Sequence, residues 1–97
     1  QVSGVPNLVD IVSPDGSNVG DAKYFTLVGG HRVPPAKFSV IAEHVWLLEK
    51  TGATTRFLVF GNDREVPVRW LARYGALVSG VRFFFMDDGG EIALISD

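Results

Sequence analysis

Residues 56–75 read RFLVFGNDREVPVRWLARYG, and this stretch decides the fold. Its first part is continuously apolar after Arg56, which is typical of a strand buried on both faces. Gly61 and Asn62 end the apolar run, and Pro67 suits the first turn of a helix, where its missing N–H needs no partner. A strand, a short polar loop and a helix in this order predict one unit of a parallel β–α arrangement.

After Pro67, apolar side chains recur at helical spacing, as in an amphipathic helix that continues to Gly80. The residues of that face are Trp70, Leu71, Tyr74, Leu77 and Val78. A similar unit precedes it, with a strand over 24–28 that stops at Gly29 and Gly30. The helix of that unit starts at Pro34–Pro35 and ends at Gly52. Its apolar stripe consists of Phe38, Ile41, Val45 and Leu48.

Shorter β segments flank these two units. Residues 8–12 are apolar enough for an edge strand, and residues 13–20 are rich in turn formers and predict a mobile loop. Residues 81–86 and 91–96 predict two strands joined by the turn Asp87–Gly90, which together form a β-hairpin. We therefore expect residues 1–23 to be an N-terminal edge strand and flexible loop, and residues 24–97 to be the α/β core domain.

The predicted element order is β-β-α-β-α-β-β, which gives a small single α/β domain. Its sheet is expected to be mixed and mostly parallel, with four to five strands, two helices and a C-terminal hairpin. The composition agrees with a packed domain, because 46% of the 97 residues are hydrophobic. The chain contains no cysteine, which excludes a disulfide scaffold, and a net charge of −2 gives no overall electrostatic attraction to nucleic acid. No apolar run approaches the roughly 20 residues of a membrane span.

An anion site is predicted where the two strands meet the loops before their helices. Ligands of open parallel sheets bind at the carboxyl ends of the strands, and helix N-termini there present free N–H groups. The candidate ligand-binding residues are Gly29, Gly30, His31, Arg32, Asn62, Arg64 and Arg69. A phosphate, a nucleotide or a nucleic-acid backbone would suit this set. Arg32 and Arg64 also fit simple ion pairing with Asp63, Glu65 or Asp87.

A different function follows if Asp63, Asp87 and Asp88 gather at the same edge. Three carboxylates could hold Mg²⁺ and support phosphoryl transfer or nuclease-type hydrolysis. Each residue also has a purely structural interpretation, because Asp63 can cap the next helix and Asp88 precedes the glycine of a tight turn. We therefore keep the small magnesium-dependent enzyme as the alternative function.

The run Phe83–Phe85 bears on partners, because side chains alternate between the two faces of a strand. If helices cover one face only, the other face is apolar and needs a second chain. The leading hypothesis is thus that the chain is a non-enzymatic binding or interaction module, either by itself or as one domain of a larger protein. It would bind a protein partner or self-associate through the apolar sheet face. No cofactor is expected, and nothing in the sequence indicates a cellular compartment.

Overall fold

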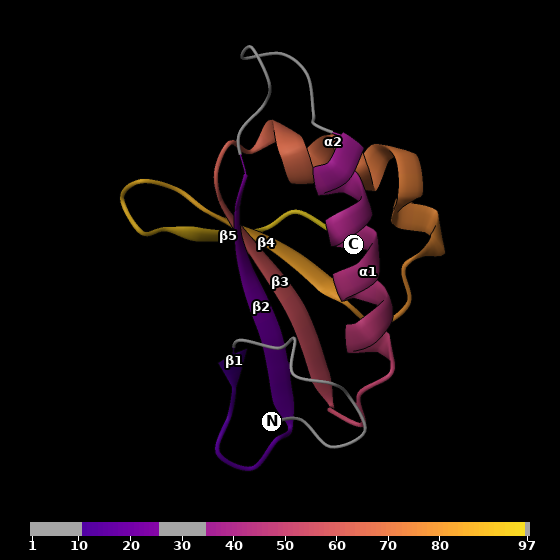
Figure 1. Cartoon of the computed structure of the whole chain (residues 1–97). Coiled ribbons are helices and arrows are strands. Elements are labelled where there is room, and N and C mark those ends of the chain that lie inside the picture. Colours follow the sequence, from indigo (N-terminus) through magenta and orange to yellow (C-terminus); the bar gives the residue numbers. More distant parts are fainter. Residues whose placement is uncertain (1–10, 26–34, 97) are drawn as a thin grey trace.

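The structure is a computed structural model that describes residues 11–25 and 35–96. Its elements follow in chain order as β1 (Ile11–Val12), β2 (Asn18–Phe25), α1 (Pro35–Glu49), β3 (Thr55–Asn62), α2 (Glu65–Tyr74), the short 3-10 helix η1 (Gly75–Leu77), β4 (Arg82–Met86) and β5 (Ile92–Leu94). The five strands form one sheet in the order β1-β2-β3-β4-β5, and the two helices pack on it (Figure 1). The predicted small α/β domain with a mixed sheet and two helices is confirmed.

The sheet is less parallel than the sequence suggested. The pairs β2–β3 and β3–β4 are parallel, whereas β1–β2 and β4–β5 are antiparallel. Only half of the strand pairings are thus parallel, because each end of the chain contributes a hairpin to an edge of the sheet. Long β–α crossovers build the middle of the sheet and short turns build its edges.

Strand β2 begins earlier than the turn-rich sequence indicated. The loop expected over residues 13–20 is wrong for its last three residues, because β2 already pairs with β3 from Asn18 onward. Val19 is fully buried under α1, and this long-range contact outweighs the local turn preference. Strand β2 runs through positions 23 and 24, where the boundary between terminal segment and core domain was placed. That division stays a prediction.

The Asp15 carboxylate organises the remaining turn between β1 and β2. It accepts hydrogen bonds from the Ser13 hydroxyl at 2.8 Å, from the Ser17 hydroxyl at 2.7 Å and from the Ser17 backbone N–H at 3.0 Å. These donors stabilise the ionised form, first of all the Ser17 N–H, and lower the pKa of Asp15 from 3.8 to about 2.

We expect a carboxyl NMR titration of Asp15 with a midpoint near pH 2. Because the folded-state pKa is depressed, this turn adds stability at pH values above the unfolded pKa of 3.8 and loses it as the pH falls toward 2. Ser17→Ala removes one hydroxyl donor and should raise the midpoint, while Ser39→Ala on α1 should leave it unchanged. An unchanged midpoint in Ser17→Ala would contradict this assignment.

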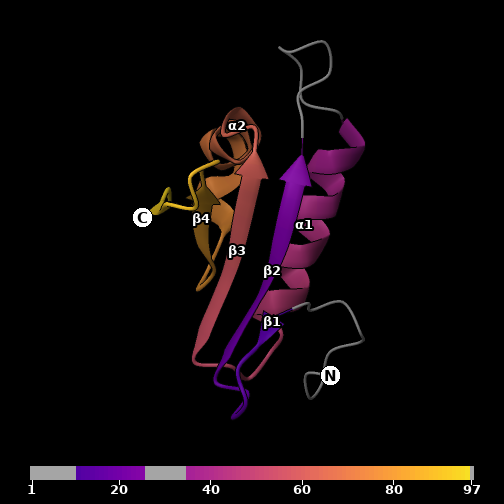
Figure 2. The ribbon, with the colours of Figure 1, turned by 90° about the vertical axis from the view of Figure 1, so that its left-hand side faces the viewer.

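Both helices pack against the same face of the sheet. The sheet contributes Val19, Leu58, Phe60 and Phe83 to the core, and the helices contribute Ile41, Val45, Leu48, Val66 and Trp70. The Phe83 ring stacks on Phe60 and on Trp70, with 5.4 Å between ring centroids in each pair. Trp70 Nε1 donates to the Phe38 carbonyl at 3.2 Å and so joins α2 to α1. In Figure 2 the strands lie in front and the helices beside or behind them.

The helix ends differ from the sequence prediction. Helix α1 ends at Glu49 rather than at Gly52, because the Thr51 hydroxyl and N–H both bond to the Leu48 carbonyl. Helix α2 stops at Tyr74, and of the predicted apolar face only Leu77 is exposed, at 80%. The other four residues of that face lie in the core or pack against it: Trp70, Leu71, Tyr74 and Val78. Neither helix in the described ranges 11–25 and 35–96 is long and apolar enough to cross a membrane.

Candidate functional site

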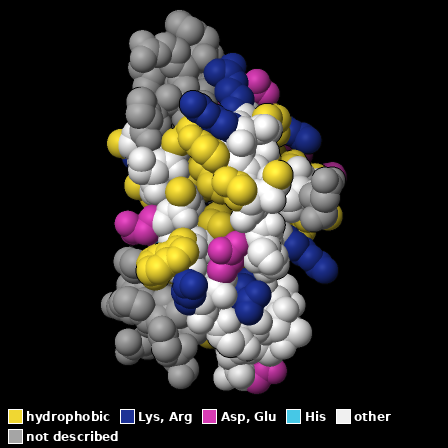
Figure 3. Space-filling model, turned by 90° about the vertical axis from the view of Figure 1, so that its right-hand side faces the viewer, with side chains coloured by type: hydrophobic (Ala, Val, Ile, Leu, Met, Phe, Trp, Pro, Cys, Tyr) yellow, Lys and Arg dark blue, Asp and Glu magenta, His cyan; other side chains and the backbone are white. Residues whose placement is uncertain are grey.

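The face of the sheet that points away from the helices has no covering layer within the described residues. Strand register places nine apolar side chains on it: Ile11, Ala22, Tyr24, Phe57, Val59, Phe84, Met86, Ile92 and Leu94. We call this set the open sheet face. The opposite, helix-covered side carries Lys, Arg, Asp and Glu side chains among its hydrophobic ones (Figure 3).

Two glycines let aromatic rings lie close over the backbone of the open sheet face. A Cβ atom at Gly20 would lie 2.5 Å from the Phe57 ring, and one at Gly61 would lie 2.9 Å from the Tyr24 ring. Each glycine is the register partner of the ring that lies over it. Because the two rings lie down on the sheet instead of standing up from it, a second flat surface can approach closely.

Exposure and charge distinguish this face from ordinary surface. Five of its side chains are between 40% and 73% exposed: Ile11, Tyr24, Met86, Ile92 and Leu94. Arg82 is the one charged residue that the strands of the described segments place on this face. Apolar side chains that are contiguous and exposed to this extent are typical of interaction surfaces.

The predicted anion site is described only in part. Gly29, Gly30, His31 and Arg32 lie outside the described residues. Strands β2 and β3 run side by side to Phe25 and Asn62, which are register partners, as expected for one sheet edge.

The described members of the predicted anion site surround the start of α2. Asn62 has a positive φ of 69°, and Arg64 is exposed at the helix N-cap. Arg69 faces Glu65 one turn earlier, with 3.5 Å between Nε and Oε1. Ion pairing was the structural alternative for Arg32 and Arg64, and the structure shows such a contact at Arg69. The anion site itself stays a prediction.

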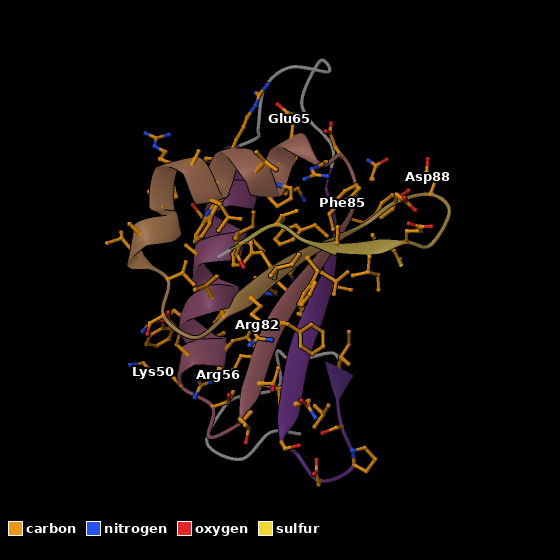
Figure 4. All side chains as sticks on the ribbon, turned by 180° about the vertical axis from the view of Figure 1, so that it is seen from behind. Lys50, Arg56, Glu65, Arg82, Phe85 and Asp88 are labelled. Carbon is orange, nitrogen blue, oxygen red and sulfur yellow. The ribbon has the colours of Figure 1, made fainter. Side chains whose placement is uncertain are left out.

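The structure does not assemble the predicted magnesium site. Asp63 instead accepts the Glu65 N–H at 3.2 Å, as a helix cap does, and Asp87 accepts the Glu91 N–H at 2.9 Å within the hairpin. Asp88 lies at the hairpin tip (Figure 4). Within residues 11–25 and 35–96, no three Asp, Glu or His side chains are grouped to hold a metal ion. Turn and cap chemistry thus accounts for Asp63 and Asp87.

A buried polar cluster, which the sequence did not indicate, lies between β2 and α1. Asp21 is 2% exposed, and its Oδ2 lies 2.6 Å from His44 Nδ1 and within ion-pair distance of Lys23 Nζ. His44 Nε2 lies 3.5 Å from the same Lys23 nitrogen. The available signal was alternation, because Asp21 and Lys23 occupy the same strand face as the buried Val19.

The open sheet face and this polar cluster therefore have different surroundings. The polar cluster is enclosed by the fold, with side-chain exposures of 12% for Lys23 and 14% for His44, so a macromolecular partner meets the open sheet face first. Comparisons of the chain with family models, with curated proteins and with solved structures found no match.

Proposed function

We propose that the protein is a non-enzymatic interaction module that self-associates through its open sheet face. The single observation behind this proposal is an apolar sheet that the described residues cover on one face only. The run Phe57–Phe60 has the composition of a strand buried on both faces, yet Phe57 and Val59 are only half-buried. A second layer would complete the burial that this composition predicts.

A second copy of the same sheet has the right shape to be that layer. Two sheets pack face to face at about 10 Å when their inner side chains are apolar. The open sheet face is flat at Gly20 and Gly61, because the Phe57 and Tyr24 rings lie over these glycines. A twofold-symmetric dimer buries the same patch on both copies, so the apolar side chains of one open sheet face meet those of the other.

The charges select one orientation of the second copy. Arg82 lies at the start of β4, and the carboxylates of Asp87, Asp88 and Glu91 lie at the β4–β5 turn, at the other end of the strand. Figure 4 shows Arg82 and Asp88 well separated in this way. A twofold axis across the strands sets Arg82 of one copy opposite the acidic turn of the other. This complementarity favours a second copy over a chain of unrelated charge pattern.

Sedimentation equilibrium of the unmodified chain over a wide concentration range tests the proposal. We expect a reversible monomer–dimer equilibrium, with the dimer predominant at high concentration. A monomer at every concentration would overturn self-association and would leave a different protein as the occupant of the face. Aggregates of undefined size would also contradict the proposal, because a twofold interface closes after two copies.

A further inference from the structure

A cavity of about 590 Å³ opens at the edge of the sheet where β3 and β4 begin. It lies on the other end of these strands from the predicted anion site. Its polar lining consists of Arg56, Arg82, Thr54, Thr55 and Ser96, and Arg56 and Arg82 lie at the same end of the sheet (Figure 4). Its volume falls within the range of small-molecule binding pockets.

Arg56 is the central group of this cavity. Its Nε donates to the Thr51 hydroxyl at 3.2 Å and its Nη2 donates to the Thr51 carbonyl at 2.9 Å. The guanidinium is therefore held in one orientation, and its third nitrogen, Nη1, lies beside Gly80, where a Cβ atom would be 3.0 Å away. Gly80 has a φ of +74°, so both its backbone and this close approach favour glycine.

The charge of Arg56 has no carboxylate partner among the described residues. The ion pairs that these residues form within 4.0 Å do not include it, and both of its printed hydrogen bonds go to neutral oxygens. The side chain is half-buried. A partly desolvated cation with fixed geometry and no counter-charge attracts an anion.

The remaining wall of the cavity is apolar. It consists of Leu71, Val78, Val81 and Ile95, which also border the hydrophobic core. A small inorganic ion would leave this wall in contact with water. An anion with a short apolar body would place its charge at Arg56 and cover the wall at the same time.

We infer that this cavity is a binding site for a small amphipathic monoanion of the carboxylate type. Thr51 accepts two of the five guanidinium N–H groups, one from Nε and one from Nη2, which leaves both N–H groups of Nη1 and the second one of Nη2 to donate to an anion. Arg56 aligns with Val19 of β2 and thus belongs to the helix-covered side of the sheet. Arg56 therefore lies outside the open sheet face, whereas Arg82 belongs both to that face and to the cavity lining.

An NMR titration of the ¹⁵N-labelled chain with hexanoate tests this inference. Hexanamide serves as the neutral probe of the same shape, and inorganic phosphate serves as an anion without an apolar body. We expect hexanoate to shift the amide signals of Gly75, Val78 and Ile95 with a millimolar dissociation constant, at least tenfold lower than that of either other probe. Equal binding of hexanamide, equal binding of phosphate, or no saturable shift would each overturn the inference.

Two variants locate the site, and a third serves as a control. Arg56→Met keeps the length of the side chain without its charge and should reduce the tenfold preference for hexanoate over hexanamide, with Arg82 left as the other cation of the lining. Ala76→Phe fills the cavity from an exposed position and should weaken hexanoate binding at least tenfold, even if Arg56→Met fails to fold. Arg73→Met changes an exposed arginine of α2 outside the cavity and should bind like the unmodified chain. Hexanoate binding that survives Ala76→Phe unchanged would place the ligand elsewhere.

Discussion

Leu94→Lys is expected to leave the protein monomeric at concentrations at which the unmodified chain is a dimer. Leu94 is 53% exposed on β5, so a single folded copy tolerates a lysine there. In the proposed dimer, both copies would bring an ammonium group into the apolar space between the sheets. Burial of an unpaired charge costs several kcal/mol, and we expect the dissociation constant to rise on the order of 100-fold or more.

Leu77→Lys is the matched control for this change. Leu77 is 80% exposed in η1, on the helix layer, and the substitution adds the same charge away from the open sheet face. Sedimentation equilibrium should show a monomer for Leu94→Lys and an unchanged monomer–dimer equilibrium for Leu77→Lys. Equal weakening by both substitutions would indicate a general effect of net charge and would contradict the proposed interface.

Asp21→Ala is expected to destabilise the fold by about 3–5 kcal/mol, because it removes one partner of a buried ion pair and leaves the other buried. Lys23 is then left with 12% exposure and loses the carboxylate that it contacts. His44 loses its hydrogen-bond partner at the same time. Such a loss is a large share of the roughly 5–15 kcal/mol that stabilises a typical domain.

A double variant separates the ion pair from simple loss of volume. Lys23→Met removes the buried charge and keeps a long apolar side chain. Urea unfolding should show that Asp21→Ala destabilises the Lys23→Met background much less than the unmodified chain. If the two free-energy changes simply add, the contact between Asp21 and Lys23 contributes nothing and this interpretation fails.

Periodic patterns in the sequence predicted the parts of the fold that depend on local spacing. The stripe Phe38, Ile41, Val45 and Leu48 is buried or half-buried in the structure, because helical period alone places these residues on one side. The hairpin around Asp87–Gly90 follows from turn chemistry between neighbouring residues. Both features are determined within a few residues of chain.

Features that depend on distant partners could not be predicted in the same way. Strand β2 contains Gly20, Asp21 and Lys23, which are poor strand formers, and its place in the sheet depends on pairing with β3. Asp21 is buried because His44 lies 23 positions later on a helix above it. No spacing in a single sequence encodes such a contact.

The apolar run Phe57–Phe60 shows a further limit of sequence patterns. Continuous hydrophobicity indicates that both faces of a strand are buried. It does not indicate whether the residues that cover each face belong to the same copy or to another chain. Leu58 and Phe60 face the helices and are fully buried, whereas Phe57 and Val59 are on the open sheet face. The prediction that both faces of this strand are buried is therefore wrong for the single copy. Burial of the second face in the proposed dimer would account for the apolar run.

Thiol labelling on the open sheet face tests self-association through this surface most directly. The chain contains no cysteine, so Ala22→Cys on β2 and Ala42→Cys on α1 each introduce one thiol at an exposed alanine. Above the dissociation constant, iodoacetamide should modify Cys at position 22 at least tenfold more slowly than in dilute solution, while position 42 reacts at one rate throughout. Concentration-independent labelling at position 22, in a sample that sedimentation shows to be dimeric, would contradict the proposal that the second copy covers this face.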